Sequence, residues 1–589
     1  MATPPRGIRF LNPKNLLSVV RVKKSNFQNA IKSKENFLEY IRTPGSKLDP
    51  EGTWSWVNED LLPTPVEKRT WLWYNYFNFY FSLSMDNWTL GSTMIGIGLS
   101  WWQSIIVIFV AQLISSIAMC VNSRVGETYH IGYPIVCRAV FGVYGAYYYV
   151  AARAVLAVVY YSIKLYVGSQ FFVVMLTAVF GKHFSDIHNA VPVSVGFTTQ
   201  QFIAFFLYWL CHIPFTLLRP NQVKWLFTVK MFTVVPACIG LFIFCMVNTK
   251  AQLGGALPKS ATLGGAGWFW IYAINSGIGN FANIITNQPD FARWAKYRGA
   301  SIWSQLFASP ISVTFAATLG ILATSAINNV WGLELWNQWD LLSAIMERYP
   351  RSDVKFAVFL CAFFWAVLVM ATNIAANMIP FGSDSSMLCP RYINMTRGQF
   401  LGLVLAWAMC PWKILFSAET FTKFLGGYII FMASAVGIMI ADYFFISRGN
   451  IMLKYLYSGD KTNPHYYYTW GWNIQALIAY VVGVVLPLPG FIGSLGADVS
   501  ETATNLGHLG WCLSFVVSIV VYLLICRVWP TQNQKAMNSM NLKFEELTGE
   551  EFIYTGDAVY GRSLDNDSVD IQDDIENAVQ ISLGGEKKS

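Results

Sequence analysis

Two residues of opposite charge, Asp86 and Lys164, lie deep inside long apolar stretches of the sequence, at 71–99 and 146–180. An unpaired charge near the centre of a bilayer costs about 2.5 to 3.5 kcal/mol on insertion scales, so each residue requires a reason to be there. At a helical rise of about 1.5 Å per residue, both fall near the middle of their stretch. Membrane carriers bind solutes at that depth, which makes this pair the first candidate for a functional site.

Other polar residues recur at helical spacing inside apolar sequence. Asn373 and Asn377 are four residues apart and share a helix face, where their carboxamides suit a heterocyclic ring that carries C=O and N–H groups. Helix–helix hydrogen bonding is the structural alternative for both asparagines. Arg153, Tyr160 and Lys164 follow one another at spacings of seven and four, so they form one stripe that we expect to face the protein interior.

The apolar segment 268–291 is interrupted near its middle by Gly277 and Gly279. The asparagines around these glycines are Asn275, Asn280, Asn283 and Asn287. Such residues weaken a continuous helix and free backbone groups to face a ligand, which is tolerated only where protein or a water-filled cavity surrounds them. A close helix crossing is the alternative, but it explains the glycines and not the asparagines.

The elements that position these residues are predicted to be membrane-spanning helices. Of the 589 residues, 54% are hydrophobic, 16% aromatic and only 13% charged, and the mean hydropathy is +0.41. A soluble core does not need so much apolar sequence. Apolar runs long enough to span a bilayer number about twelve, so we expect an all-α integral membrane domain over 71–527 between polar tails at 1–70 and 528–589.

The distribution of basic residues predicts that both tails are cytoplasmic. Lys and Arg cluster in residues 1–70, which lack an apolar stretch typical of a cleavable signal. Arg293, Lys296 and Arg448 repeat this bias in loops expected on the same side, although Arg348 falls on the outer side. The net charge of +8 follows from this topology and does not indicate a nucleic-acid partner.

Several classes of function have no support in the sequence. The ten cysteines are scattered without a Cys-x-x-Cys pair, so neither a disulfide framework nor a metal site is expected. No phosphate-binding glycine motif indicates ATP-driven pumping. No trio of nucleophile, base and orienting residue indicates an enzyme. We therefore expect no cofactor beyond a coupling ion.

Six stretches of the chain are distinctive enough to compare with known sequences. They are GLSWWQSI (98–105), RVGETYHIGYPIVCRAVFG (124–142), NQPDFARWAK (287–296), ATNIAANMIPFGSDSSMLCPRYINMTRG (371–398), CPWKIL (410–415) and GIMIADYFFISRG (437–449). In these stretches, and in their order, the chain resembles the nucleobase:cation symporter-1 family, and within it the fungal permeases for uracil, uridine and allantoin. The similarity covers about residues 55 to 530.

This resemblance implies a leucine-transporter-type fold, in which two inverted repeats of five helices precede two further C-terminal helices. The first and sixth helices of such a fold are broken. In relatives, the solute lies between an aromatic residue of the third helix and one of the sixth, which correspond to Tyr160 and Phe281 in this chain. The matching polar contacts are Asp86, Lys164 and Asn377, with Asn373 beside them.

Two departures from the family pattern fall at these solute positions. The usual Trp-Tyr-Gly-x-Gln of the third helix reads Tyr160-Tyr161-Ser162-Ile163-Lys164, and the usual Asn-Thr-Trp of the first reads Asp86-Asn87-Trp88. Because the new charges are opposite and similar in depth, we infer an ion pair across the site. The resemblance implies a carrier of a nucleobase, nucleoside or hydantoin-like solute. A carrier of a vitamin or cationic heterocycle, of the thiamine or pyridine-nucleoside type, is the alternative, and a sensor or channel is a weaker one.

Energy coupling is expected to use protons rather than sodium. Sodium-coupled relatives have a hydroxyl pair beside the eighth-helix site, whereas Ala371 leaves Thr372 as the one hydroxyl here. Asp86 can carry a proton only if Lys164 leaves it, because a cationic partner favours the charged carboxylate. The further coupling or gating candidates are Lys230, which matches a family position or snorkels, and Asp290 with Arg293, expected to form a surface pair at the inner end of the sixth helix.

The tails are expected to be regulatory. Residues 545–576 are acidic and poor in aromatic residues, which predicts disorder. Family resemblance implies a ubiquitin-ligase adaptor as a partner of the tails, and a solvated tail without a partner is the alternative. The remaining partners expected are the heterocyclic solute and membrane lipid, with the chain placed in the plasma membrane.

Overall fold

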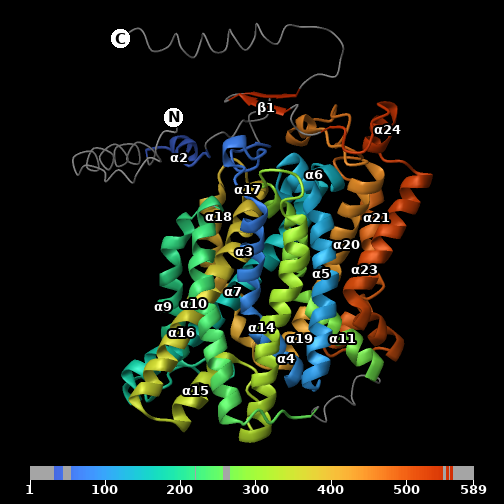
Figure 1. Ribbon diagram of the computed structural model, residues 1–589. Helices are drawn as coiled ribbons and strands as arrows, with labels where there is room; N and C mark the ends of the chain where they lie inside the picture. The colour runs from blue at the N-terminus through green and yellow to red at the C-terminus, as the bar shows by residue number, and fades with distance from the viewer. Residues whose placement is uncertain are drawn as a thin grey trace, which may run out of the picture.

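The computed structural model describes residues 32–43, 55–218, 220–255, 266–547, 552–555 and 558–561. These residues form a bundle of long helices, confirming the predicted all-α membrane fold (Figure 1). Six helices are long and apolar enough to cross a membrane: Trp101–Tyr129, Gly145–Phe180, Ile302–Trp331, Ser352–Leu388, Ala418–Ile446 and Glu501–Val528. The bent pair Ile474–Val485 and Leu488–Ser494 makes a seventh if it is one span. Shorter or broken helices complete the arrangement of about twelve.

The helices follow the order expected for two repeats and a C-terminal pair. The first five positions are occupied by α3 (Trp73–Ser84) with α4 (Trp88–Gly96), α5 (Trp101–Tyr129), α7 (Gly145–Phe180), α9 (Thr199–His212) and α10 (Pro220–Asn248). The next five are α11 (Ala266–Gly279) with α12 (Ala282–Thr286) and α13 (Gln288–Ala292), α14 (Ile302–Trp331), α16 (Ser352–Asn373) with α17 (Ile379–Leu388), α18 (Met395–Leu405), and α19 (Ala418–Gly427) with α20 (Ile429–Ala441). The last two are α21 (Ile474–Val485) with α22 (Leu488–Ser494), and α23 (Glu501–Val528).

Shorter elements lie at the two ends of this bundle. They are α2 (Lys34–Tyr40), α6 (Tyr133–Phe141), α8 (Lys182–Ser185), α15 (Gln338–Arg348), α24 (Gln532–Ser539) and the antiparallel strands β1 (Phe552–Thr555) and β2 (Ala558–Gly561). In Figure 1, α2, α6 and α24 lie at one end, and α15 and the end of α4 lie at the other. The end that carries α2 and α24 is the one we expect to face the cytoplasm, and it is called the inner end below.

The first and sixth helices are broken, as the sequence predicts. A 3-10 turn, η2 (Met85–Asn87), separates α3 from α4, and Asn280 with Phe281 separates α11 from α12. Gly279, at the second break, packs so close to the carbonyl oxygen of Leu425 that a Cβ there would clash with it. Small residues thus let the end of α19 approach the break, while short polar side chains compete with the helical hydrogen bonds around it.

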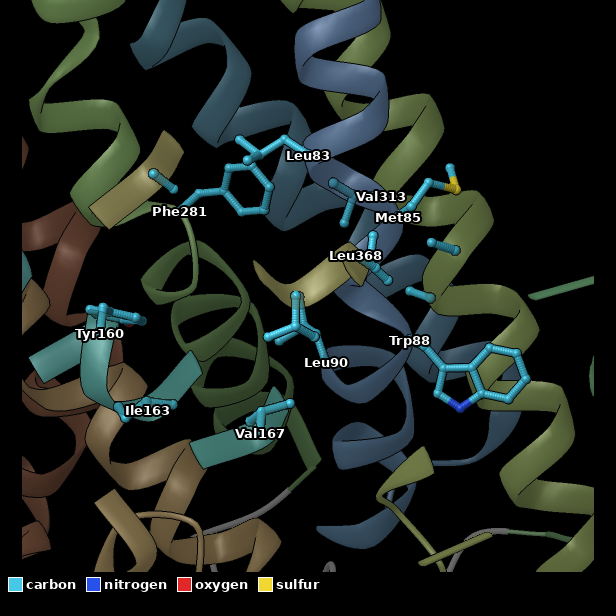
Figure 2. Packing of buried hydrophobic residues seen from close by; sticks show 14 of the residues in the cluster. Leu83, Met85, Trp88, Leu90, Tyr160, Ile163, Val167, Phe281, Val313 and Leu368 are labelled. Atoms are coloured by element: carbon cyan, nitrogen blue, oxygen red, sulfur yellow. The ribbon is translucent and has the colours of Figure 1, made fainter. Parts of the chain in front are cut away.

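Apolar side chains pack around both breaks. Trp88 and Trp365 are at most 1% exposed and meet edge to face, with ring centres 5.7 Å apart. Figure 2 shows Leu83, Leu90 and Phe281 of this core between the helices. Large apolar residues on outward helix faces remain exposed, as expected for helices that contact a bilayer rather than water; examples are Phe232, Trp303, Ile311, Phe363 and Val516.

Part of the C-terminal region predicted to be disordered is structured. After α23 the chain forms α24 and a segment at 541–547 that packs onto the inner end of α5. The Glu545 carboxylate accepts two hydrogen bonds from Arg124, at 2.8 and 2.6 Å, and one from Tyr443 at 2.9 Å. The prediction of disorder is wrong here, because composition does not reveal that Arg124 on α5 binds the acidic residue Glu545. Most of residues 548–576 lies outside the described part of the chain.

Candidate functional site

A cavity lies between the two helix breaks, α7 and α16 with its continuation. Its lining residues are Leu83, Asp86, Asn87, Tyr160, Lys164, Asn280, Phe281, Asn283, Ile284, Thr372, Ala376 and Asn377. The structure therefore brings together most of the residues predicted as a site from separate helices. The predicted residues that do not line the cavity are Asn373, Lys230, Asp290 and Arg293.

Asp86 and Lys164 are paired. The Lys164 ammonium lies 2.5 Å from Oδ2 of Asp86, and this is its one polar contact among the described residues. The Lys164 side chain is 23% exposed and that of Asp86 only 6%. Both side chains line the cavity, and Lys164 is the more exposed of the two.

Two aromatic rings border the cavity from different helices. Tyr160 is fixed by its hydroxyl, which lies 2.6 Å from that of Tyr428, and by ring contact with Phe424 at 5.6 Å. Phe281 is 2% exposed and occupies the break of the sixth helix. Figure 2 shows the two side chains on facing elements rather than packed on each other. Their placement suits a flat solute held between them, with the Tyr160 ring preset by its neighbours.

Asn373 supports the site from behind. It is fully buried, and its amide donates to the backbone oxygen of Tyr161 at 2.9 Å. Its side-chain oxygen accepts from Asn377 at 2.9 Å, which leaves Asn377 facing the cavity. In this structure, Asn373 orients the amide of Asn377 and does not itself reach the cavity.

A π-helical turn, η6 (Ile374–Met378), carries Asn377 and was not predicted. Pro380 follows it and has no N–H for the carbonyl of Ala376, and its ring crowds that carbonyl in a regular α-helix. Widening the turn relieves this clash. The sequence signal that could have revealed the π-helical turn was Pro380, four residues after Ala376 inside an apolar helix.

Three further asparagines belong to the site, although the sequence argument assigned none of them to solute. Asn280 donates to the side-chain oxygen of Asn87 at 2.6 Å, which joins the two broken helices. The nitrogen and oxygen of the Asn283 amide are both buried without a hydrogen-bond partner among the described residues. A buried amide without a partner costs about 1 to 3 kcal/mol, so Asn283 is the strongest new candidate for a solute contact.

Lys230 and Thr372 form a second polar contact beside the cavity. The Lys230 ammonium donates to the Thr372 hydroxyl at 2.6 Å and lies 5.3 Å from the ring centre of Phe227. The hydroxyl in turn donates to the carbonyl oxygen of Leu368 at 3.0 Å. Lys230 is fully buried, so it does not extend to the membrane surface, and the snorkelling alternative is wrong.

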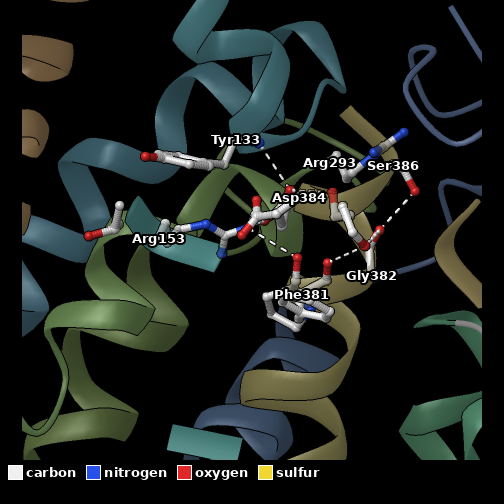
Figure 3. Close-up of polar contacts among 12 residues, drawn as sticks. Tyr133, Arg153, Arg293, Phe381, Gly382, Asp384 and Ser386 are labelled. Carbon is white, nitrogen blue, oxygen red and sulfur yellow. Dashed lines mark hydrogen bonds and ion pairs between the residues drawn. The ribbon is translucent and has the colours of Figure 1, made fainter. Parts of the chain in front are cut away.

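Asp290 and Arg293 do not form the predicted surface pair. Both are buried, and the Asp290 carboxylate lies 3.3 Å from the Arg153 guanidinium, which also binds Asp384 (Figure 3). Arg293 donates to the Thr64 hydroxyl at 2.7 Å instead. A spacing of three residues suggested an ion pair within one helix. The true partners come from α7, α17 and the chain before α3, and local sequence does not show such contacts.

Known proteins with similar sequences are permeases. A family model described as "Permease for cytosine/purines, uracil, thiamine, allantoin" matches residues 63–514. The allantoin permease of Saccharomyces cerevisiae is 34% identical over 497 residues, covering 82% of this chain and 78% of that protein. The uracil permease of the same organism is 33% identical over 509 residues, covering 84% and 80%.

A solved structure shows the same fold. Mhp1, described as a nucleobase-cation-symport-1 family transporter in a closed conformation with bromovinylhydantoin bound, is 18% identical to this chain. The two align with a TM-score of 0.59 over 82% of this chain and 100% of Mhp1. The predicted arrangement of repeats and broken helices is thereby confirmed.

Proposed function

Because the chain belongs to the family of permeases for cytosine/purines, uracil, thiamine and allantoin, it is a multi-pass membrane transporter and not an enzyme, and we propose that it imports a heterocyclic solute together with protons. The solute is a nucleobase, nucleoside or hydantoin-like molecule. The recognition of this family from the sequence is confirmed.

The observation that carries the proposal is the cavity between the two broken helices. Tyr160 and Phe281 offer aromatic faces to a flat ring, and the Asn283 and Asn377 amides offer donors and acceptors for its edge. An isolated amide is expensive to bury, and a solute with C=O and N–H groups removes that cost. Such a cavity near the middle of the bundle fits alternating access.

Proton coupling is supported by the contact between Lys230 and Thr372. Sodium-coupled relatives have two hydroxyl groups beside the eighth-helix site, whereas this chain has one, that of Thr372. This hydroxyl already accepts a hydrogen bond from the Lys230 ammonium at 2.6 Å. A sodium ion at this hydroxyl would stand beside a like charge in a low-dielectric interior, which is unfavourable. Asp86 is the proton carrier we propose, because it is the one acidic side chain among the residues that line the cavity.

We also propose that Asp290 and Arg293 belong to an inner gate. Arg293 donates to the backbone oxygen of Leu62 at 2.6 Å, which ties α13 to the chain before α3. A second cavity, at the inner end of the sixth helix, is lined by Phe79, Asp290 and Ser383 among others. Release of a solute toward the cytoplasm along this route requires the contacts of Arg293 to open.

Uptake by the full-length chain in a host without its own nucleobase carriers tests the proposal. We expect accumulation of at least one radiolabelled heterocycle from a panel of uracil, uridine, allantoin and a carboxylated pyrimidine such as orotate. A protonophore should collapse the accumulation, and replacement of sodium by choline should not change it. Strict dependence on sodium would contradict proton coupling, and uptake that never exceeds the external concentration would contradict a carrier.

Location and tail partners complete the proposal. Placement in the plasma membrane with cytoplasmic tails is supported by the basic bias of residues 1–70 and by α2 and α24 lying at one end of the bundle. A ubiquitin-ligase adaptor remains the proposed partner of the tails. Immunostaining of tagged termini with and without permeabilised membranes tests the orientation, and external exposure of either tag in intact cells would contradict it.

A further inference from the structure

We propose that the solute of the central cavity is an anion, namely a flat heterocycle of about nucleobase size that carries a carboxylate group. This inference rests on the proposed transport of heterocycles and narrows their chemical class. Two observations support it: the charges of the residues around the cavity, and the hydrogen-bonding groups of the lining residues that have no partner in the protein.

The described residues around the cavity hold two ammonium groups against one carboxylate. Asp86 is the one acidic side chain among the lining residues, and Lys164 lies opposite it. Lys230 does not line the cavity, but its ammonium donates to the hydroxyl of Thr372, which does. No carboxylate among the described residues lies within ion-pair distance of the Lys230 ammonium. An anion in the cavity would balance this excess, whereas a cation would increase it.

The position of Lys164 lets it bind two carboxylates at once. An ammonium group has three donors, and Asp86 accepts from one of them. Lys164 lines the cavity and is the more exposed member of the pair, so its remaining donors are available to a group bound there. A solute carboxylate can accept from them without breaking the contact with Asp86. The ion pair then holds the ammonium in place, and binding does not require a buried charge to be stripped of its partner.

The amides lie where the ring of such a solute would need them. Asn283 has both amide atoms free, and Asn377 has one N–H and its oxygen left after its bond to Asn373. These groups match ring C=O and N–H groups, while the carboxylate meets Lys164. A cationic heterocycle fits poorly, because the Asp86 carboxylate is already paired with Lys164 and the solute would have to displace that ammonium.

Two probes that differ by one carboxylate test the inference. Uracil is neutral, and orotate is the same ring with an ionised carboxylate. We expect cells that express this chain to take up radiolabelled orotate at least about tenfold faster than uracil, because only orotate offers a carboxylate to the remaining donors of Lys164. Excess unlabelled orotate should block uptake, and excess uracil should not.

Variants separate the role of the charge from general damage to the fold. Lys164→Gln together with Asp86→Asn should reverse the preference toward uracil, while Lys164→Arg keeps the positive charge and should keep the preference for orotate. Lys423→Gln removes an ammonium that pairs with Glu419 outside the cavity and should change neither. All four chains are compared at equal surface abundance. Because Asp86 is also the proposed proton carrier, the preference is measured as competition between the two solutes for initial uptake and not as accumulation.

The outcomes distinguish this inference from the function on which it rests. Uptake of uracil that orotate neither shares nor inhibits would overturn the anionic class and leave heterocycle transport standing. A chain that reaches the surface and accumulates none of orotate, uracil, uridine and allantoin would overturn both. An unchanged preference in the Asp86→Asn, Lys164→Gln double variant would also overturn the assignment of selectivity to this pair.

Discussion

The central cavity and the inner network of charges use similar residues but balance them differently. In the inner network, the Arg153 guanidinium lies between the carboxylates of Asp384 and Asp290, and all three side chains are at most 7% exposed (Figure 3). In the cavity, Asp86 faces one ammonium directly, and Lys164 keeps 23% of its side chain exposed. One set of charges is enclosed by protein, and the other is open to a space that a solute can enter.

This difference separates a contact that holds helices together from a site that needs a ligand. The positive charges of Arg153 and Arg293 match the negative charges of the inner network, although Oδ2 of Asp384 has no hydrogen-bond partner there. The cavity has an excess of positive charge and a whole amide, that of Asn283, without a partner among the described residues. Charge imbalance beside a cavity indicates the ligand, whereas balanced charge in a closed interior indicates helix packing or a gate.

The largest effect should follow removal of the guanidinium that centres the inner network. Arg153→Ala leaves the buried carboxylates of Asp384 and Asp290 without the guanidinium that lies between them, and removing one partner of a buried pair typically costs about 3 to 5 kcal/mol. We expect little of this variant at the cell surface and a clear loss of thermal stability after purification. Quantitative surface labelling and a melting curve in detergent measure the two effects.

An exposed arginine provides the matched control. Arg351 also pairs with an aspartate, Asp353, but the two side chains are 73% and 63% exposed. Arg351→Ala should change stability by about 0.5 kcal/mol or less, because exposed pairs contribute little. Normal surface abundance of Arg153→Ala would contradict the claim that the enclosed inner network is a main support of the fold.

The next effect concerns the pair in the cavity. Asp86→Asn or Lys164→Gln alone leaves one charge without its partner, so each should lower surface abundance, but less than Arg153→Ala because Lys164 is partly exposed. The double variant has neutral amides at both positions and should recover abundance toward that of the unmodified chain. The cycle should give a coupling energy of about 0.5 to 3 kcal/mol. Strictly additive defects would mean that the two residues act separately.

The features that could be predicted from the sequence are residues that are unusual inside a membrane-spanning helix. A charge in an apolar run, and glycines with asparagines inside a predicted span, stand out because they are costly where they occur. The Asp86–Lys164 pair and the break near Phe281 were predicted on that basis, and the structure contains both. The resemblance to a family then ordered the helices, which composition alone does not do.

Features that depend on contacts between distant segments were not predicted. Asp290 pairs with Arg153 rather than with Arg293, because α7 passes beside α13 and residues 60–64 cover the end of α13. The bond between Asn87 and Asn280 exists only because two breaks face each other. Packing of one chain segment against another decides such contacts, and helical spacing carries no information about it.

Smaller effects, confined to solute binding, should follow loss of the cavity amides. Asn283→Ala and Asn377→Ala each remove a hydrogen-bonding group that faces the cavity, which corresponds to about 1 to 3 kcal/mol, or about 5- to 150-fold in apparent affinity. Both variants should reach the surface normally. Phe281→Ala should also weaken binding, but deletion of a ring that is 2% exposed disturbs packing as well.

Concentration-dependent uptake measures the apparent affinities, and an amide outside the cavity serves as the control. Asn329 is exposed and donates to the backbone oxygen of Gln252 at 3.1 Å, so Asn329→Ala should leave affinity unchanged. Equal affinity for Asn283→Ala and the unmodified chain would show that an amide without a protein partner does not mark the ligand. That result would contradict the claim that the cavity differs from the inner network by needing a ligand.

The smallest effect is expected where a charge pair lies at the inner rim. Burial raises the pKa of the Glu545 carboxyl, but the hydrogen bonds and charge of Arg124, with Tyr443 and Arg298, outweigh it and hold this pKa below its usual value. A lowered pKa means that the contact contributes its full stability above the usual glutamate pKa of about 4.3 and loses it as pH falls through the lowered value. At neutral pH the segment that carries Glu545 should therefore be docked.

Glu545→Gln removes this charge without touching the cavity or the inner network. We expect the segment after α24 to be cleaved several-fold faster by a protease added to inside-out vesicles, because local release of a chain end costs far less than unfolding of the bundle. Surface abundance and solute affinity should stay as they are in the unmodified chain. If Glu545→Gln instead impaired folding as strongly as Arg153→Ala, enclosure would not govern what a charge pair contributes, and the contrast between closed and open charges would fail as an explanation.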